Sequence, residues 1–176
     1  MATTNSLFLD TLRAGTVLAD GGIGSLIFQL TGRLASAEFV YEALNLRNPA
    51  LIKGIYASSL AAGATVLTTN TFVANTAELE IAGIADQTRR INQAAVEIAH
   101  DAISEYKREY SESSAHFFVI GSIGPGGDGA EVYAVQIDAL IESGVDAILL
   151  ETFTDIELAL EITRAISSRS EAPPVI

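Results

Sequence analysis

The sequence predicts an α/β protein built from repeated strand–helix units, and two similar stretches carry this prediction. They are Gly63–Phe72 and Gly144–Asp155. In each stretch a glycine precedes an apolar run, and the seventh residue after the glycine is polar (Asn70 or Glu151) and is followed by Thr-Phe. A glycine that ends a helix, a strand buried on both faces and a polar strand tip explain this pattern. Such units build parallel sheets covered by helices.

The first predicted unit has the same order. Residues 6–14 form a short helix or an irregular lead-in, and Val17–Ala19 is a brief apolar strand that ends at Asp20. Gly21-Gly22-Ile23-Gly24 follows, and it either makes a tight turn or lets the backbone approach a ligand, with free N–H groups facing an anion. Because Asp20 stands beside these glycines at the carboxyl end of a strand, the sequence favours the ligand interpretation.

Helix and strand signals alternate through the middle of the chain. Residues 25–47 carry few periodic signals and are expected to form a long connection. Asn48-Pro49 predicts a helix start, with Asn48 as the N-cap, and this helix runs to Gly63. The second strand is Ala64–Thr69, and a loop containing Asn75 then leads to a helix from about 86 to 106. Its expected buried face is Ile91, Ala94, Ala95, Ile98, Ala99, Ala102 and Tyr106.

Two more units follow a polar linker at residues 110–115. The third strand is Phe117–Gly121, and the loop Ser122-Ile123-Gly124-Pro125-Gly126-Gly127 after it could cradle an anion or simply turn. A helix with Tyr133, Ile137, Leu140 and Ile141 inward leads to Gly144 and to the fourth strand at 147–150.

Glu151 stands where the fourth strand ends. Parallel α/β proteins place binding and catalytic groups at this end of their strands, although the residue could also serve only to end the strand. The next helix, about 156–168, begins with Asp155 as its N-cap or with Thr154 and Glu157 as a capping box. Residues 173–176 begin a fifth strand. A (β/α)8 TIM barrel takes about 250 residues, so these units predict a single domain, 1–176, that is the amino-terminal half of such a barrel.

Composition and charge narrow the function classes. The 176 residues are 49% hydrophobic, which suffices for a core, and the net charge of −12 argues against nucleic acid and anionic membranes as partners. No apolar run approaches the roughly 20 residues of a membrane span, and the first fifteen residues do not resemble a signal peptide. The chain contains no cysteine, which excludes disulfides and thiolate metal sites and agrees with a cytoplasmic location.

Five motifs in this order resemble the homocysteine S-methyltransferase family, which includes methionine synthase and betaine–homocysteine methyltransferase. The motifs are Asp20-Gly21-Gly22-Ile23-Gly24, Asn48-Pro49, Thr69-Asn70-Thr71-Phe72, Ser122-Ile123-Gly124-Pro125 and Glu151-Thr152-Phe153-Thr154-Asp155. The resemblance covers about residues 15–176. It implies a TIM barrel that transfers a methyl group to the thiol of homocysteine and so forms methionine.

The resemblance also assigns a substrate site. It implies that Asp20 and Glu151 bind the α-ammonium of homocysteine. Gly21 and Gly22 are suitable N–H donors for its carboxylate, and Asn70 and Ser122 would line the same mouth as polar supports. This agrees with the chemistry, because a zwitterionic amino acid needs anions for its ammonium and N–H donors for its carboxylate.

One departure from the family is large. The resemblance implies a zinc ion that activates the thiol and that is held by three cysteines from later strands. This chain has no cysteine, and His100 and His116 are predicted away from the strand tips. We therefore predict no catalytic residue, no metal ligand and no activity for the isolated chain. The methyl donor stays open.

Two other readings remain. The chain could be a non-catalytic half-barrel that binds an amino acid or pairs with a complementary chain. It could also be an aldolase-type lyase, but such an enzyme needs a lysine at a strand tip, and Lys53 and Lys107 are predicted on helices.

A half-barrel would leave two sheet edges and one sheet face open, so we expect a homodimer or a pair with a complementary chain. Candidates for the uncovered face are Val17, Val66, Leu67, Val119, Ile148 and Leu150.

Overall fold

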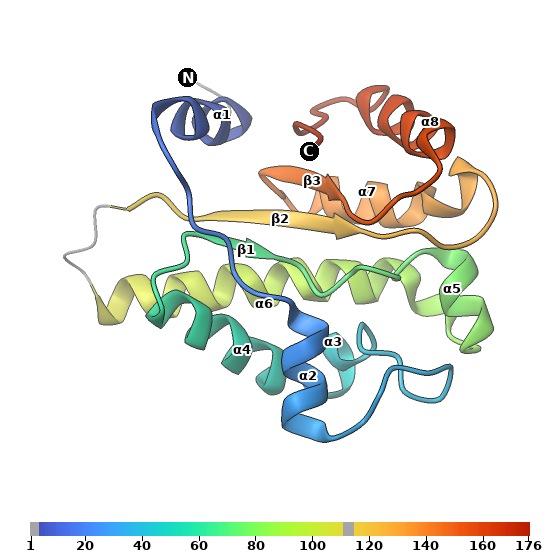
Figure 1. Cartoon of the computed structure of the whole chain (residues 1–176), viewed down its shortest axis with the longest axis horizontal. Coiled ribbons are helices and arrows are strands. Elements are labelled where there is room, and N and C mark those ends of the chain that lie inside the picture. Colours follow the sequence, from blue (N-terminus) through green and yellow to red (C-terminus); the bar gives the residue numbers. More distant parts are fainter. Residues whose placement is uncertain (1–3, 111–114) are drawn as a thin grey trace.

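The structure, a computed structural model that describes residues 4–110 and 115–176, contains a parallel sheet with helices on both sides (Figure 1). Its three strands are β1 (Val66–Thr68), β2 (Phe118–Ile123) and β3 (Ala147–Leu150), in that order. The α/β prediction with a parallel sheet is therefore confirmed. The predicted linker at 110–115 falls mostly on residues 111–114, which lie outside the described residues.

Two further segments extend the sheet without becoming full strands. Ala19 forms an isolated parallel bridge with Val66, and Val175 forms one with Ile148. The predicted strand at 17–19 is therefore wrong as a strand, although its place in the sheet is right. Both segments lie at sheet edges, where a chain has one neighbour and few backbone partners.

Helices surround this sheet, and their ends follow the capping signals. Asn48 caps the helix that begins at Pro49, as predicted, by accepting from Leu51 N (3.4 Å). Asp155, not Thr154, caps the last helix, by accepting from the backbone N–H groups of residues 157 and 158. The helices are α1 (Thr4–Ala14), α2 (Ile23–Thr31), α3 (Leu44–Arg47), α4 (Pro49–Ala61), α5 (Thr76–Ile81), α6 (Thr88–Glu109), α7 (Ala134–Glu142) and α8 (Ile156–Ser167), with 3₁₀ turns η1 (Ala85–Gln87) and η2 (Ala130–Tyr133).

Most of α2 and all of α3 lie within residues 25–47, which were expected to form a long connection with few periodic signals, so this connection contains two helices that were not predicted. One reason is that α2, with the sequence IGSLIFQLT, lacks a start signal: its N-cap residue is Gly22, no side chain caps it, and its first turn contains no acidic residue. Only Ile23 and Ile27 of this helix are buried, while Phe28 and Leu30 are exposed.

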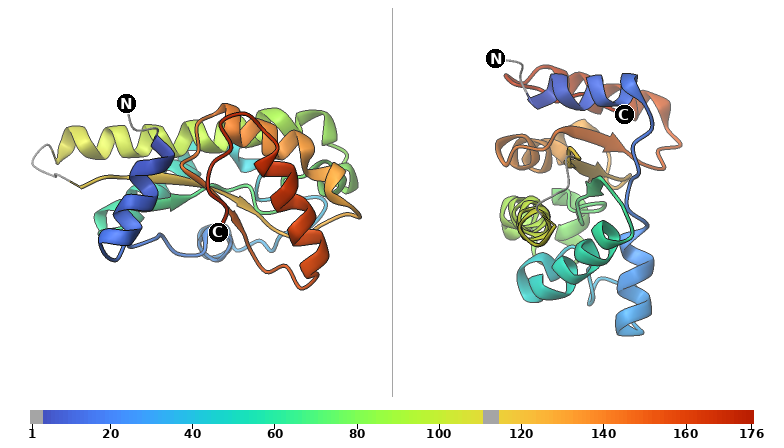
Figure 2. Two further views of the ribbon diagram at one scale, coloured as in Figure 1. Left: turned by 90° about the horizontal axis from the view of Figure 1, so that it is seen from above. Right: turned by 90° about the vertical axis from the view of Figure 1, so that its left-hand side faces the viewer.

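Side chains alternate between the two faces of the sheet. Leu67, Val119 and Ile148 are fully buried in the large core formed with the helices. Val66 and Phe118 face the other way and pack under Phe8 of α1, which meets the Phe118 ring edge-on at 5.1 Å. Figure 2 shows α6 and α7 on one side of the sheet and α1 on the other.

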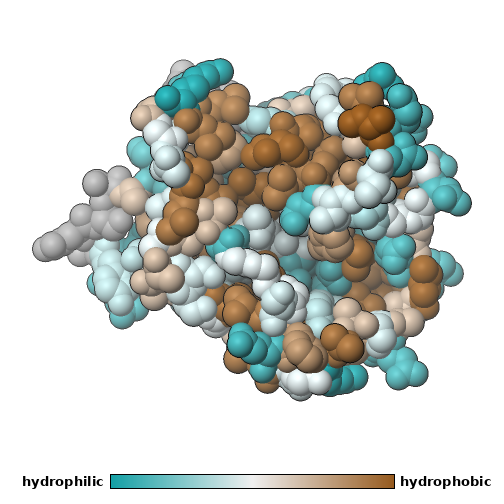
Figure 3. Space-filling view, in the orientation of Figure 1, coloured by the Kyte–Doolittle hydropathy of each residue, from teal (hydrophilic) through white to brown (hydrophobic). Residues whose placement is uncertain are grey.

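The prediction of an uncovered sheet face is therefore largely wrong. Leu67, Val119 and Ile148 are covered by helices, Val66 is covered by α1, and only Val17 and Leu150 of the predicted set stay partly exposed. Instead, exposed apolar side chains gather between α1 and α8 (Figure 3). The large apolar side chains that are exposed anywhere on α1, α8 and the two edge segments are Leu7, Leu12, Leu18, Ile156, Leu160 and Ile176.

The buried faces of the two predicted amphipathic helices are confirmed. Ile91, Ala95 and Ala99 of α6 have no exposed surface, and neither do Ile137 and Leu140 of α7. Within the described residues, no helix is both long and apolar enough to cross a bilayer.

Candidate functional site

The alternation along the strands brings polar side chains together at one end of the sheet. Ser122 lies on the same face of β2 as Phe118 and Ile120, and Glu151 lies on the same face as Ala147 of β3. Ser122 pairs with Leu149 in the parallel register. Glu151 comes two residues after Leu149, so it lies on the same face as Ser122, directly after the end of β3. The strand tips therefore converge, as the sequence predicts.

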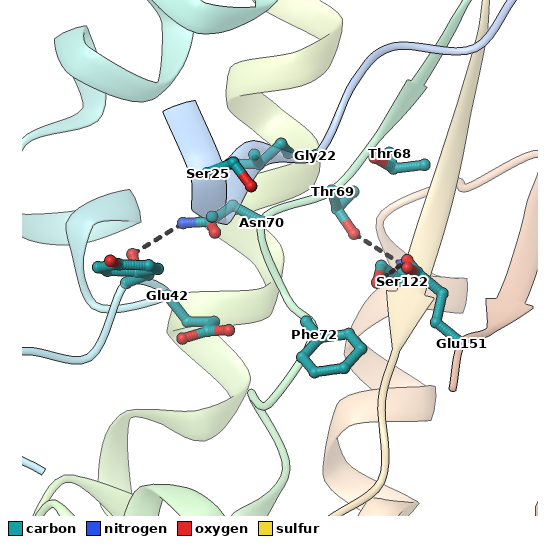
Figure 4. A pocket seen from close by; sticks show the side chains of 12 residues that line it. Gly22, Ser25, Glu42, Thr68, Thr69, Asn70, Phe72, Ser122 and Glu151 are labelled. Atoms are coloured by element: carbon teal, nitrogen blue, oxygen red, sulfur yellow. Dashed lines mark hydrogen bonds between the residues drawn. The ribbon is translucent and has the colours of Figure 1, made fainter. Parts of the chain in front are cut away.

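A cavity of about 250 Å³ lies at these tips (Figure 4). Four of the six predicted site residues line it, namely Gly22, Asn70, Ser122 and Glu151, whereas Asp20 and Gly21 do not. The other lining residues are Ile23, Gly24, Ser25, Tyr41, Glu42, Thr68, Thr69 and Phe72.

Glu151 is oriented by its neighbour on β2. The Ser122 hydroxyl donates a hydrogen bond to Glu151 Oε1 (2.6 Å), and Glu151 N donates to Ile123 O (2.9 Å). Ser122 is itself fixed, because its N–H donates to Thr69 Oγ1 (3.1 Å) and its side chain is buried. The carboxylate of Glu151 is thus held in place while remaining only partly buried.

Asp20 does not line the cavity but contacts Thr68, which does. Its carboxylate accepts hydrogen bonds from Thr68 N (3.1 Å) and Thr68 Oγ1 (2.9 Å), and Thr68 lines the cavity. Burial raises the pKa of Asp20 to about 6, the bonds from Thr68 oppose this rise, and repulsion from Glu151 adds to it. The negative charges of Asp20 and Glu151 therefore repel each other, and a cation bound between them would reduce this repulsion.

The amino end of α2 opens onto the same cavity. Gly22 is the N-cap residue, no side chain caps the helix, and the first helical bond runs from Leu26 N to Gly22 O (3.3 Å). The N–H groups of the first turn are therefore not used by the helix, and they carry the positive end of its dipole. Gly22 has an ordinary φ of −63°, and a β-carbon there would meet Ser25 Oγ at 3.7 Å, an ordinary contact distance, so neither the backbone nor the space requires a glycine here.

Asn70 supports the site and already has partners for its donor groups. Its side-chain amide donates to Tyr41 O (2.8 Å) and to Asn45 Oδ1 (3.0 Å), and its backbone N–H donates to the Tyr56 hydroxyl (3.1 Å). Asn70 therefore joins the tip of β1 to α3 and α4.

Glu42 and Tyr41 are lining residues that sequence reasoning missed. Glu42 is 4% exposed and accepts from Val73 N (3.1 Å); burial raises its pKa, the bond from Val73 opposes this, and Glu78 adds to it. Both residues come from the segment between α2 and α3, whose sequence shows no periodic signal. The Asn48-Pro49 helix start just after them was the nearest available clue.

In the glycine loop after β2, two backbone N–H groups are used by contacts within the protein. Gly124 N donates to Phe72 O (2.7 Å), and Gly126 N donates to the Tyr133 hydroxyl (2.8 Å). These N–H groups are consequently not free for an anion. A side chain at Gly127 would also collide with Ala77, since its β-carbon would lie 2.6 Å from that of Ala77.

The described residues do not fit a catalytic metal. In residues 4–110 and 115–176, no three His, Cys, Asp or Glu side chains are grouped so that they could hold an ion. His100 and His116 are both exposed and lie outside the cavity lining. The sequence also contains no cysteine, so no thiolate ligand is available.

The chain is similar to known methyltransferases. Residues 17–176 match the sequence profile described as homocysteine S-methyltransferase. The methionine synthase of Mycobacterium leprae is 32% identical, in an alignment that covers 84% of this chain and 13% of that protein.

The fold is also shared with solved structures. The homocysteine methyltransferase MmuM from Escherichia coli superimposes with a TM-score of 0.82 in its oxidised form and 0.81 in its metallated form, each at 20% identity. Both superpositions cover 97% of this chain and 64% of MmuM. The chain thus spans about two thirds of that protein and a small part of the methionine synthase.

Proposed function

Because the chain belongs to the homocysteine S-methyltransferase family, we propose that it forms the amino-acid-binding part of a homocysteine S-methyltransferase site. The observation that carries the proposal is the placement of Glu151, held by Ser122, in the same cavity as the uncapped amino end of α2. An anion and a set of N–H donors in one cavity match the two charged groups of an α-amino acid.

The residues then have separate tasks. Glu151 accepts hydrogen bonds from the α-ammonium of homocysteine. Asp20, which accepts hydrogen bonds from Thr68, adds a second negative charge. The first-turn N–H groups of α2, at Gly22 and Ile23, bind the α-carboxylate. With both charged groups bound, the thiol side chain extends along the remaining wall, toward Phe72. Binding of this kind orients the thiol for attack on a methyl group.

Methyl transfer needs more than this chain contains. A thiol has a pKa of about 8.5 and must become a thiolate to attack, which the zinc implied by the family resemblance would achieve. Since these residues offer no ligand set for zinc, we derive no step through it. We propose that the chain corresponds to the first four βα units of the barrel, and that alone it binds homocysteine without transferring a methyl group.

A second function is favoured by the open edges of the sheet. Among the described residues, the segments at Ala19 and Val175 pair on one side only, and exposed apolar side chains lie close to both. We propose that these edges bind either a second copy of the chain or a complementary half-barrel chain, which could also complete the metal site.

Replacing Glu151 tests the binding proposal. Glu151→Gln keeps the shape of the side chain but removes its charge, so the dissociation constant for L-homocysteine should rise by about 10- to 100-fold in calorimetry. Glu157→Gln, on the exposed surface of α8, removes the same charge and should leave binding unchanged. Equal affinity of the wild type and Glu151→Gln would overturn the assignment.

A further inference from the structure

We propose that Phe72 is a specificity-determining residue of the cavity and that Gly124 is the residue that positions its ring. The proposal rests on the proposed function, because it concerns the side chain of the same amino acid. Phe72 follows the tip of β1 and lines the cavity. In Figure 4 its ring stands between Glu42 on one side and Ser122 with Glu151 on the other.

Gly124 packs against the edge of the Phe72 ring. A β-carbon on Gly124 would lie 2.4 Å from Phe72 Cε2 and 2.5 Å from Cζ, far inside the roughly 3.5–4.0 Å of a normal carbon contact. The φ angle of Gly124 is not in the left-handed region, so the backbone does not require glycine here. Glycine is required because the Phe72 ring occupies the space that a side chain at position 124 would take.

Hydrogen bonds hold the backbone around Phe72 on both sides of the ring's attachment. Gly124 N donates to Phe72 O (2.7 Å), which ties the two loops together. Buried side chains hold the neighbouring peptide groups: Tyr56 accepts from Asn70 N (3.1 Å), Gln136 donates to Thr71 O (2.6 Å) and Glu42 accepts from Val73 N (3.1 Å). A side chain at Gly124 would therefore displace the ring and leave the loop in place.

A fixed ring limits the amino acids that the cavity accepts. With the ammonium at Glu151 and the carboxylate at α2, the side chain of the ligand runs toward Phe72. An aromatic face tolerates sulfur well, but its rigid position sets a maximum length. The geometry points to a cavity that accepts the thiol of homocysteine and disfavours the longer thioether of methionine.

Calorimetry with L-homocysteine and L-methionine tests this inference. Phe72→Ala should lower the ratio of the methionine to the homocysteine dissociation constant by about tenfold, the usual value of one methyl group in an apolar pocket. Gly124→Ala should raise the homocysteine dissociation constant by about tenfold when Phe72 is present and by less than about twofold in the Phe72→Ala background. Gly54→Ala, where a β-carbon meets no neighbour, should change neither constant.

The outcomes separate this inference from the proposed function. If the wild type binds neither amino acid, the proposed function itself is wrong. If it binds homocysteine but Phe72→Ala leaves the ratio unchanged, only the role of Phe72 is wrong. Thermal unfolding tests the positioning separately, because Gly124→Ala should lower the melting temperature only while Phe72 is present. If Gly124→Ala lowers the melting temperature equally with Phe72 and with Phe72→Ala, Gly124 does not position the ring.

Discussion

The Ser122 hydroxyl donates a 2.6 Å hydrogen bond to Glu151 and thereby joins the tips of neighbouring strands. Ser122 is 3% exposed, so water has little access to the hydroxyl, and the bond is made to a charged acceptor. Such bonds are shorter and stronger than those between neutral groups. The pair therefore holds the Glu151 carboxylate at the place where we propose that the ammonium of the ligand binds.

Removing the hydroxyl should loosen Glu151 without removing its charge. For Ser122→Ala we expect the homocysteine dissociation constant to rise about 3- to 10-fold, less than for Glu151→Gln, because only the orienting bond is lost. Calorimetry of both single variants and of the double variant checks this. If the losses of binding free energy in the two single variants add up fully in the double variant, Ser122 acts independently of Glu151.

The pH dependence of stability should report Asp20. Its pKa is about 6 in the folded chain against an ordinary 3.8, so the folded state binds this proton more tightly than the unfolded state. The stability that Asp20 contributes is therefore complete below about pH 4 and is lost as the pH rises through 6. Asp20→Asn keeps a side-chain oxygen that accepts from Thr68 but does not titrate, so the variant should not lose this stability as the pH rises.

Urea unfolding of wild type and Asp20→Asn between pH 4 and pH 7 measures the effect. Relative to wild type, the variant should gain about 2 to 3 kcal/mol over this range. Because Glu42 and Asp146 also have raised pKa values and are present in both proteins, their contributions cancel. Parallel curves for the two proteins would contradict the assignment.

The start of α8 offers a test of the local fold. Asp155 Oδ1 accepts from Glu157 N (3.0 Å) and Leu158 N (3.2 Å). Asp155→Ala should therefore cost about 1 kcal/mol of unfolding free energy, while Thr154→Ala should cost almost nothing. Thermal unfolding of the two variants decides between the caps, and a larger loss for Thr154→Ala would favour the capping box.

Much of the site could be predicted because strand tips have local signals. Gly63 and Gly144 adopt left-handed φ angles of +100° and +84°, as expected for residues that end helices. Gly144 fixes where β3 begins, and the two-residue period then carries Glu151 to the face of Ala147. The same period places Ser122 on the face of Phe118 and Ile120 of β2. Local sequence was sufficient for these residues.

Other parts of the site depend on tertiary contacts and had no such signal. Glu42 reaches the cavity only because α3 packs on α6 and brings the segment before it to Val73. Asp20 was expected to face one pocket with Glu151, but it does not line the cavity. Its hydrogen bonds with Thr68 depend on the pairing of an edge segment that is too short to be a strand. Neither arrangement can be read from periodicity.

Assembly follows from the exposed edges. We expect sedimentation at micromolar concentration to show a homodimer, because Leu18, on the edge segment beside β1, is 56% exposed. Leu18→Lys should shift the equilibrium toward the monomer, since a charge on an edge opposes strand pairing. A wild-type monomer that melts cooperatively would contradict the homodimer and leave the complementary chain as the partner.

Calorimetry of the wild-type chain with three ligands tests the central claim most directly. The ligands are L-homocysteine, its analogue without the amino group and its methyl ester, which lack the cation and the anion in turn. We predict measurable binding of homocysteine and a loss of about tenfold or more for each analogue, because each leaves one charged partner in the cavity unpaired. Equal binding of all three ligands, or binding of none, would contradict the claim that this chain holds homocysteine by both of its charged groups.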